Sequence, residues 1–464
     1  MPKDAIATAE DIRSGRRSAR EVVEESIARI EARDPELNVM VAPRFDEALA
    51  EVDAGLPDGP LTGVPIVVKD LGADVAGLPT TRGSRLWADD VKAADSELVR
   101  RYRAAGMVVL GKTNTPELGK NASTEPLLFG PTRNPWDPTR SPGGSSGGSA
   151  AAVSSGMVPV GHANDGGGSI RIPAAACGLF GLKPSRGRVS SAPYASALAG
   201  PVTVQHAVTT TVRDSALLLD LTAGTVPGDA YGAADPPTSY LAACERDPAP
   251  LRVGVATALP GVDTDPQCVE AVLGAARLLA DLGHTVVEVE PGWDPGDVGA
   301  TSGLLMGAEL VVAVRERLAR LGRDLRDNDL EPFTRVMVDH YATLPMADLS
   351  GALRRAQEIG WEVGAAFHDV DVLLVPTLAR PTPPLGTLDT TRPEVMYEIA
   401  AIYSAWTAVA NLTGLPAASV PWGLDEGGVP LGVQLVADMG AEHTLVALSG
   451  QLERVAPWQR LAPA

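Results

Sequence analysis

Residues 141–171 read SPGGSSGGSAAAVSSGMVPVGHANDGGGSIR and contain two glycine-dense loops, 143–148 and 165–169, joined by an apolar run. Glycine lets the backbone approach a ligand closely and adopt positive φ. Consecutive free N–H groups in such a loop can hold an anion. Ser169 follows three glycines, so it is well placed to attack a carbonyl group whose developing oxyanion falls among these donors.

The first loop is open to three further interpretations. Glycine and serine alone are typical of a flexible linker, but the uncharged apolar segment 150–160 predicts a buried helix leading into a strand, which favours a site. A phosphate-binding loop needs a lysine where Ser149 stands. A nucleophile elbow at Ser146 needs a preceding strand, whereas residues 134–142 contain three prolines. The last two stay as minor alternatives.

A serine nucleophile needs a general base. The six histidines lie in no recognisable motif. The stretch 63–70, GVPIVVKD, predicts a buried strand that ends at Lys69, and a lysine made neutral by burial could serve as the base. By spacing alone, an ordinary surface lysine at this position is the favoured interpretation. Lys112 follows a similar predicted strand and is a second candidate.

Taken together, these motifs resemble those of the amidase signature family. The resemblance covers about residues 5–455, and its further motifs are GKTNTPE at 111–117, NPW at 134–136, GLFGLKP at 178–184 and NLTGLP at 411–416. It implies a single amidase domain over residues 1–464. Its fold would be α/β, with a mixed, twisted β-sheet covered by helices on both faces, and the alternation of predicted strands and helices agrees with this.

The resemblance also implies a catalytic triad. Ser169 would be the nucleophile, Ser145 the bridging serine with its peptide bond in the cis form, and Lys69 the ultimate base. To accept a proton, Lys69 must be largely neutral, so its pKa must fall from about 10.4 towards about 7 to 8. Lys112 would then not be catalytic and would pair with a nearby carboxylate.

The oxyanion hole would consist of the N–H groups from Gly166 through Gly167 and Gly168 to Ser169. Asn121 lies in the loop that approaches the substrate in this family, where it could hydrogen-bond an amide or carbamate; a surface turn is the alternative. Many members carry a β-branched residue at the position of Gly166. This glycine should therefore loosen the oxyanion hole or admit a bulkier substrate.

The resemblance implies a serine amidohydrolase that forms an acyl-enzyme on Ser169 and needs no metal or organic cofactor. The Gly-Gly-Gly-Ser form is similar to the branch that includes nylon-oligomer, aryl-amide and carbamate (urethane) hydrolases. Gly166 and the apolar region at about 291–350 predict a hydrophobic or bulky small-molecule substrate. One alternative is a glutamine-type amidotransferase subunit acting with a partner protein, against which Ile172 counts, because such subunits usually have glutamine there. An esterase using Ser146 and a catalytically inactive scaffold remain as further hypotheses.

The composition of the chain disfavours several classes of binding partner. With 58 acidic and 39 basic residues the net charge is −19, which disfavours nucleic acid and anionic membranes. The three cysteines form no metal-ligand pattern, and Cys177 reads as a small buried residue. No apolar signal-peptide region or membrane-spanning run is found, so a cytoplasmic protein is expected. A homodimer is possible on family grounds only.

Apolar periodicity and capping residues predict the elements. The predicted strands are 64–69, 107–110, 158–163, 251–256, 285–289, 370–375, 417–420 and 431–436. The predicted helices are 19–34, started by a capping box at Ser18 and ended by Asp34-Pro35, and then 44–54, 96–105, 267–282, 394–412 and 442–454. Residues about 291–350 are expected to form a helical insert that faces the substrate.

Overall fold

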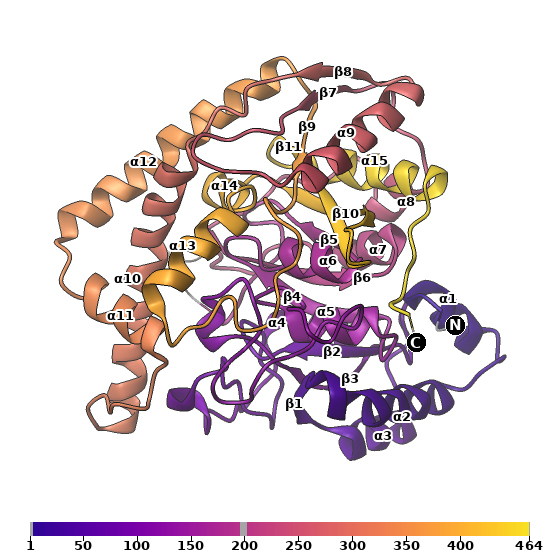
Figure 1. The fold of residues 1–464 in the computed structure, drawn as a ribbon. Helices are drawn as coiled ribbons and strands as arrows, with labels where there is room; N and C mark the ends of the chain where they lie inside the picture. Colours follow the sequence, from indigo (N-terminus) through magenta and orange to yellow (C-terminus); the bar gives the residue numbers. More distant parts are fainter. Residues whose placement is uncertain (1–2, 195–201, 464) are drawn as a thin grey trace.

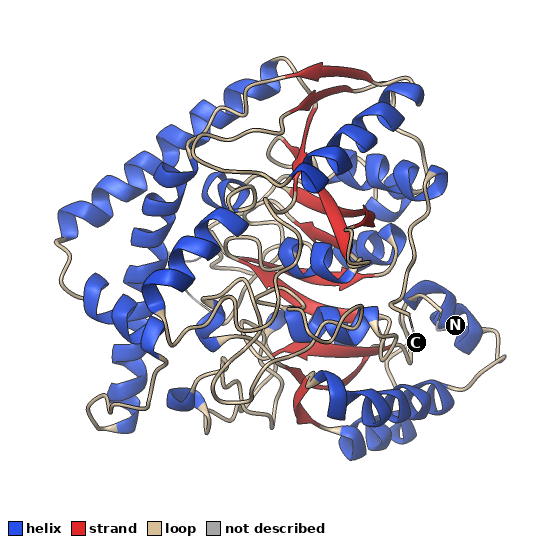
Figure 2. Ribbon diagram, viewed as in Figure 1, coloured by secondary structure: helices blue, strands red, loops and turns tan. Residues whose placement is uncertain are grey.

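The computed structural model describes residues 3–194 and 202–463, and within them eleven strands form one sheet (Figure 1, Figure 2). In spatial order the strands are β1 (Met40–Pro43), β3 (Val108–Thr113), β2 (Pro65–Lys69), β4 (Val160–Asp165), β6 (Val204–Thr209), β5 (Phe180–Lys183), β10 (Ala417–Leu424), β11 (Pro430–Ala437), β9 (Val372–Pro376), β7 (Arg252–Val255) and β8 (Thr285–Glu288). The parallel pairs are β3–β2, β2–β4, β9–β7 and β7–β8. The other neighbours are antiparallel, so the predicted mixed sheet is confirmed.

Helices cover both faces of the sheet. Successive side chains of a strand point to opposite faces, so neighbouring residues of one strand belong to different buried clusters. Ile66 and Val68 belong to one buried cluster, whereas Val67 belongs to another. The helices of the first face are α1 (Ala5–Arg13), α4 (Glu97–Ala104), α7 (Val212–Thr222), α8 (Tyr240–Cys244), α9 (Pro266–Asp281) and α15 (Glu442–Val455). The helices of the second face are α2 (Ala19–Leu37), α3 (Phe45–Ala54), α5 (Gly147–Ser154), α6 (Arg171–Cys177), α10 (Pro295–Leu321), α12 (Met346–Gly364) and α14 (Ala408–Thr413).

Two helix boundaries differ from the sequence prediction. The capping box at Ser18 is present, but α2 continues through Pro35 to Leu37 and ends at Asn38, whose φ of 53° is left-handed. The predicted helix 394–412 is two helices, α13 (Pro393–Tyr403) and α14. Between these two helices, the hydroxyl of Thr407 binds the carbonyl oxygen of Gly167, and the carbonyl oxygen of Thr407 binds Arg171.

The predicted insert corresponds to three helices that stand beside the sheet (Figure 1). They are α10, α11 (Pro332–Tyr341) and α12, so the helical region extends to Gly364 rather than to about residue 350. Within the described residues α10 is the one helix with the length and composition to cross a membrane. It contacts α11, α12 and α14, and core helices of globular domains satisfy the same criteria. The short 3₁₀ helices are η1 (Arg85–Trp87), η2 (Glu117–Gly119) and η3 (Ala365–His368).

Candidate active site

The candidate site lies where two neighbouring parallel strands end. Lys69 is the last residue of β2, and Asn164 is the last but one of β4. Parallel strands end at the same edge of a sheet, so these two side chains meet there. The loop before α5 returns to this edge with Ser145, whose peptide bond to Gly144 is cis. The edge thus brings together Lys69 and Ser145, which are 76 residues apart in sequence.

The amine of Lys69 is completely buried and lies close to three oxygen atoms. Its Nζ is 2.7 Å from Oγ of Ser145, 2.9 Å from Oγ of Ser146 and 2.6 Å from Oδ1 of Asn164. Burial penalises the charged form and holds the pKa of Lys69 well below its usual 10.5, although the carboxylate of Asp165 acts in the opposite direction. A neutral amine at this position can accept a proton.

The hydrogen bonds around Lys69 show where its lone pair points. Oδ1 of Asn164 can only accept, and the hydroxyl of Ser146 donates its proton to the carbonyl oxygen of Ser169 at 2.5 Å. These two oxygens therefore take the two protons of a neutral Lys69 amine. The third contact is Oγ of Ser145, which leaves the lone pair of Lys69 to accept the proton of that hydroxyl.

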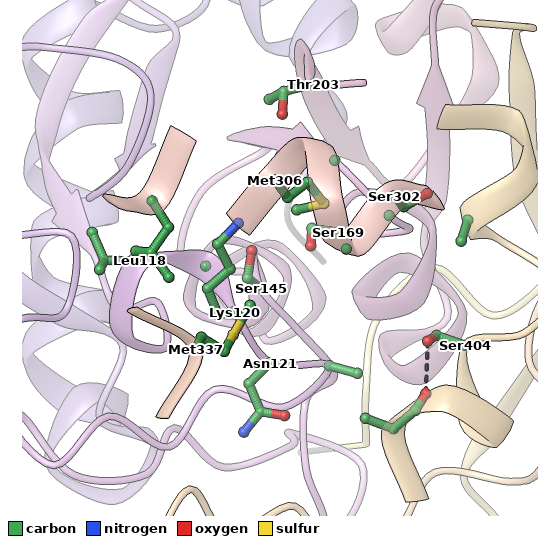
Figure 3. Close-up of a pocket in the computed structure, with 18 of the residues that line it drawn as sticks. Leu118, Lys120, Asn121, Ser145, Ser169, Thr203, Ser302, Met306, Met337 and Ser404 are labelled. Atoms are coloured by element: carbon green, nitrogen blue, oxygen red, sulfur yellow. Dashed lines mark hydrogen bonds between the residues drawn. The ribbon is translucent and has the colours of Figure 1, made fainter. Parts of the chain in front are cut away.

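Ser145, which contacts Lys69, lines a cavity of about 470 Å³ (Figure 3). Ser145 and Ser169 both line this cavity, whereas Lys69 does not. Ser169 lies in the turn between β4 and α6. A group bound in the cavity can therefore contact Ser169 directly and can exchange a proton with Lys69 through Ser145.

The glycine loop 165–169 contributes backbone N–H groups to the lining of the cavity. Gly166, Gly167 and Ser169 line it, and in the described part of the chain no hydrogen-bond acceptor takes their N–H groups. The N–H of Gly168 differs, because it donates to Oδ1 of Asp165 at 2.6 Å. The N–H of Gly168 is thus already used within the loop, which leaves those of Gly166, Gly167 and Ser169 as the candidate oxyanion donors.

A buried ion pair holds the same loop in place. The guanidinium of Arg171 binds the carboxylate of Asp165 through Nε at 2.9 Å and Nη2 at 3.0 Å. The remaining N–H groups of Arg171 donate to Oδ1 of Asn411, Oε1 of Gln434 and the carbonyl oxygen of Thr407. These contacts connect the loop to β11 and α14. The loop is therefore fixed by elements more than 200 residues away in sequence.

The elbow at Ser146 is not supported by the geometry. Ser146 is completely buried, does not line the cavity, and its hydroxyl binds the backbone of Ser169. None of the six histidines, all of which are described, lines the cavity either. His162, for example, is buried and accepts a hydrogen bond from the backbone N–H of Lys69 at 3.2 Å. A histidine-dependent esterase using Ser146 therefore lacks its base.

Three other residues singled out in the sequence have structural partners. Asn121 lines the cavity and is buried, so it is not in a surface turn; its amide donates to the carbonyl oxygen of Leu388 at 2.8 Å. Lys112 is buried and lies 3.9 Å from the carboxylate of Asp70, as a lysine paired with a carboxylate should. Cys177 is buried, and burial raises the pKa of its thiol.

Much of the apolar wall of the cavity comes from the insert that the sequence predicted to face the substrate, although the sequence did not single out the individual residues. Helices α10, α11 and α13 supply Met306, Leu310, Met337, Tyr341, Met396 and Tyr397. A Cβ at Gly166 would lie 3.0 Å from Oγ1 of Thr203 and 3.6 Å from Cε of Met306. Thr203 and Met306 therefore already occupy part of the space that Gly166 was expected to leave open. The sequence indicated the insert as a whole, but no local pattern in it shows which of its side chains line the cavity.

Comparisons with known proteins agree with this fold and site. The family model described as Amidase matches residues 21–446. The 6-aminohexanoate-cyclic-dimer hydrolase of Paenarthrobacter ureafaciens is 38% identical over 489 residues, which cover 99% of this chain and 96% of that protein. A solved structure of 6-aminohexanoate cyclic dimer hydrolase has a TM-score of 0.92 at 35% identity, covering 99% of this chain and 98% of that one. A bacterial aryl acylamidase has a TM-score of 0.89 at 31% identity, covering 98% and 96%.

The fold, the buried lysine and the serine-lined cavity together define a hydrolase of carbon–nitrogen bonds. More specifically, the chain belongs to the amidase family, as the family model and the extent of the similarity to its relatives show.

Proposed function

We propose that this amidase cleaves its substrate through an acyl-enzyme on Ser169. The observation that carries the proposal is the 2.7 Å contact between Nζ of Lys69 and Oγ of Ser145, since Ser145 in turn lines the same cavity as Ser169. Oγ of Ser169 attacks the carbonyl carbon of the amide. Its proton passes to Oγ of Ser145, while the proton of Ser145 passes to the neutral amine of Lys69.

The tetrahedral intermediate carries its negative charge on the former carbonyl oxygen. The N–H groups of Gly166, Gly167 and Ser169 stabilise this oxyanion, and one such donor is typically worth a factor of about 10² to 10³ in kcat. Collapse breaks the C–N bond, and the proton held by Lys69 returns through Ser145 to the leaving nitrogen. Water then attacks the acyl-enzyme by the same proton route and releases the carboxylic acid.

The cavity favours an amide with a hydrophobic body. Methionine, leucine and aromatic side chains from α10, α11 and α13 form much of its wall, and its volume of about 470 Å³ suits a small molecule. We therefore propose aryl amides, nylon-type aminohexanoate amides and carbamates (urethanes) as substrate classes. The insert, about 291–350 in sequence and 295–364 as helices, would act as the substrate-facing wall of a single amidase domain.

Hydrolysis of a matched panel tests the proposal. The panel contains an aryl anilide, an aryl carbamate, a linear aminohexanoate amide and glutamine. Wild type is compared with Ser169→Ala, Lys69→Ala and, as a matched control, Ser155→Ala, which removes a hydroxyl that binds the carbonyl oxygen of Ala151 within α5. Activity should be lost in the first two variants and retained in the control. Full activity of Ser169→Ala would overturn the assignment of the nucleophile.

The amidotransferase alternative makes a different prediction with the same panel. It requires hydrolysis of glutamine alone, dependent on an added partner protein. A homodimer, which rests on family resemblance, and a cytoplasmic location are further proposals. Light scattering of the purified protein tests the first, and fractionation of the cells that produce it tests the second.

A further inference from the structure

Arg82 is a cation in the cavity wall that has no anionic partner among the described residues. Its side chain is half-buried and lines the same cavity as Ser169. The guanidinium carbon lies 5.0 Å from the ring centroid of Trp87 and 5.9 Å from that of Tyr194. Among residues 3–194 and 202–463, no acceptor takes its side-chain N–H groups, and its Nε is buried without a partner. Arginine contributes five N–H donors, so this is an unusual position for it.

The backbone fixes this side chain. Arg82 has a φ of 57°, which is uncommon for a residue other than glycine. Its N–H donates to the carbonyl oxygen of Asp70 at 3.0 Å, and its carbonyl oxygen accepts from the N–H of Leu118 at 2.7 Å. The guanidinium carbon lies over the rings of both Trp87 and Tyr194. Stacking of this kind leaves the N–H groups at its edge available to an acceptor in the guanidinium plane.

The carboxylates of Asp70 and Asp74 already have hydrogen-bond partners other than Arg82. The carboxylate of Asp70 accepts the N–H and the hydroxyl of Thr81 and lies 3.9 Å from Nζ of Lys112. Asp74 accepts hydrogen bonds from the hydroxyls of Tyr194 and Thr80. Burial raises the pKa of Asp70 to about 6, and Lys112 and, more weakly, Arg82 act in the opposite direction, so Arg82 and Asp70 interact without being hydrogen-bonded. In the part of the chain that the structure describes, nothing on this side of the cavity neutralises Arg82 by direct contact.

Two other charged residues line the cavity, Lys120 and Glu309. They have opposite signs, and Glu309 opposes the effect of burial, which lowers the pKa of Lys120 to about 8. Lys120 extends into the cavity near Ser145 and Met306 (Figure 3). The charges of Lys120 and Glu309 offset each other. Arg82, which stays protonated at any working pH, is therefore the excess positive charge of the cavity wall.

We propose that the substrate of this amidase carries a carboxylate in addition to its scissile amide, and that Arg82 binds this carboxylate. A guanidinium matches a carboxylate with two parallel hydrogen bonds, and a partly buried, stacked arginine loses little freedom when it forms them. The inference rests on the proposed function, because it assigns the second recognition element of the same cavity. The carboxylate could stand on the acyl side or on the amine side of the amide.

Two pairs of substrates distinguish the acyl side from the amine side. On the acyl side, N-succinyl-4-nitroaniline is compared with the neutral N-butyryl-4-nitroaniline. On the amine side, N-butyryl-4-aminobenzoate is compared with N-butyrylaniline. Each is assayed with wild type, Arg82→Met and Arg82→Lys. The matched control is Arg85→Met, because Arg85 is an exposed arginine three residues away that does not line the cavity.

In at least one pair, wild type should prefer the charged substrate by about tenfold or more in kcat/KM, the size expected of a charge-assisted hydrogen bond. Arg82→Met should abolish this preference while changing turnover of the neutral substrate by less than about threefold. Arg82→Lys should keep part of the preference, and Arg85→Met should keep all of it. An equal ratio in wild type and Arg82→Met for both pairs would overturn the proposal, as would wild-type preference for both neutral substrates.

Binding to Ser169→Ala separates this inference from the proposed mechanism. Calorimetry of the uncleaved substrates should give a Kd for the charged member about tenfold lower than for its neutral isostere, and the difference should vanish in Ser169→Ala/Arg82→Met. If no amide is hydrolysed but this difference is present, the mechanism fails and the carboxylate site stands. If amides are hydrolysed but the two Kd values are equal, only the proposed carboxylate site is contradicted. Should Arg82→Met not fold, the same comparison with Arg82→Lys decides, because lysine cannot form the two parallel bonds.

Discussion

The hydroxyl of Thr407 lies 2.6 Å from the carbonyl oxygen of Gly167 and donates to it, although 240 residues separate them. Thr407 lies at the junction of α13 and α14, which the sequence predicted as continuous helix. The N–H of the same peptide group, that of Gly168, donates to Asp165. Both sides of this peptide plane are therefore held, which orients the N–H groups on either side of it in the cavity.

Replacing the hydroxyl of Thr407 should weaken catalysis more than binding. Thr407→Val keeps the shape but leaves the carbonyl oxygen of Gly167 without this donor. We expect kcat to fall by about tenfold with little change in KM, since a lost hydrogen bond costs about 1–3 kcal/mol. Steady-state kinetics on the best anilide measures this. Thr407→Ser keeps the hydroxyl and should behave like wild type; equal losses in both variants would contradict the role of the hydrogen bond.

The glycines of the nucleophile loop should differ in their tolerance of a methyl group. Gly168 has a φ of 134°, and a Cβ there would lie 2.4 Å from Oγ1 of Thr407 and 2.7 Å from Cδ1 of Ile172. Gly168→Ala should therefore lower both Tm and activity. A Cβ at Gly167 would meet no atom of the described residues within 4 Å beyond its chain neighbours, so Gly167→Ala should keep its Tm and affect only turnover. Thermal melts of the two variants compare them; equal Tm values would refute the prediction.

The pH profile of kcat/KM should report the protonation of Lys69. Burial lowers the pKa of Lys69, and the proton route needs its neutral form. Activity should therefore be on a plateau well below pH 10.5, and it should fall about tenfold per unit on the acid side once Lys69 takes up a proton. The profile is measured from about pH 5 to about pH 10 with a neutral anilide. A rate that still rises tenfold per unit near pH 10 would contradict a lysine with a lowered pKa.

Lys183 should make the stability of the protein depend on pH. It is completely buried, its Nζ donates to the carbonyl oxygen of Pro184 at 2.9 Å, and burial, with Arg171, lowers its pKa from 10.5 to about 7. Between these values the unfolded chain binds more protons at Lys183 than the folded one does, so this group makes stability rise with pH. The slope is at most about 1.4 kcal/mol per unit.

The variant Lys183→Met removes that contribution. Urea denaturation at several pH values should show wild type gaining stability relative to Lys183→Met as the pH rises from about 7 to about 10. Parallel curves for the two proteins over this range would show that Lys183 is not neutral in the folded state.

Breaking the ion pair between Arg171 and Asp165 should destabilise the fold. Both side chains are completely buried, so Arg171→Met leaves a buried carboxylate without its cation, which costs about 3–5 kcal/mol. Urea denaturation measures the free energy of unfolding. Arg277→Met is the control, because its pair with Glu270 is exposed and should contribute less than about 1 kcal/mol. Similar losses in the two variants would contradict the importance of burial.

The sequence predicted much of the sheet because its strands are short apolar runs that end at glycine, proline or charged residues. The runs 64–69 and 370–375, for example, correspond to β2 and β9. Strands β1, β5 and β6 were missed; the sequence of β6, VQHAVT, carries polar residues whose partners are supplied only by the fold. One of these residues is His206, whose ring binds Ser215.

By itself the sequence determined the chemical groups of the candidate site, which are Lys69 after a buried strand and Ser145 and Ser169 in glycine-rich loops. The order of these motifs along the chain indicated the family. The tertiary structure decided which of their atoms meet. Lys69 and Ser145 approach to 2.7 Å because β2 and the loop before α5 reach one edge of the sheet. The tertiary structure also decided that the N–H of Gly168 binds Asp165, and that the side chain of Arg82 has no hydrogen-bond partner among the described residues. Such contacts depend on packing between distant segments, which local sequence patterns do not encode.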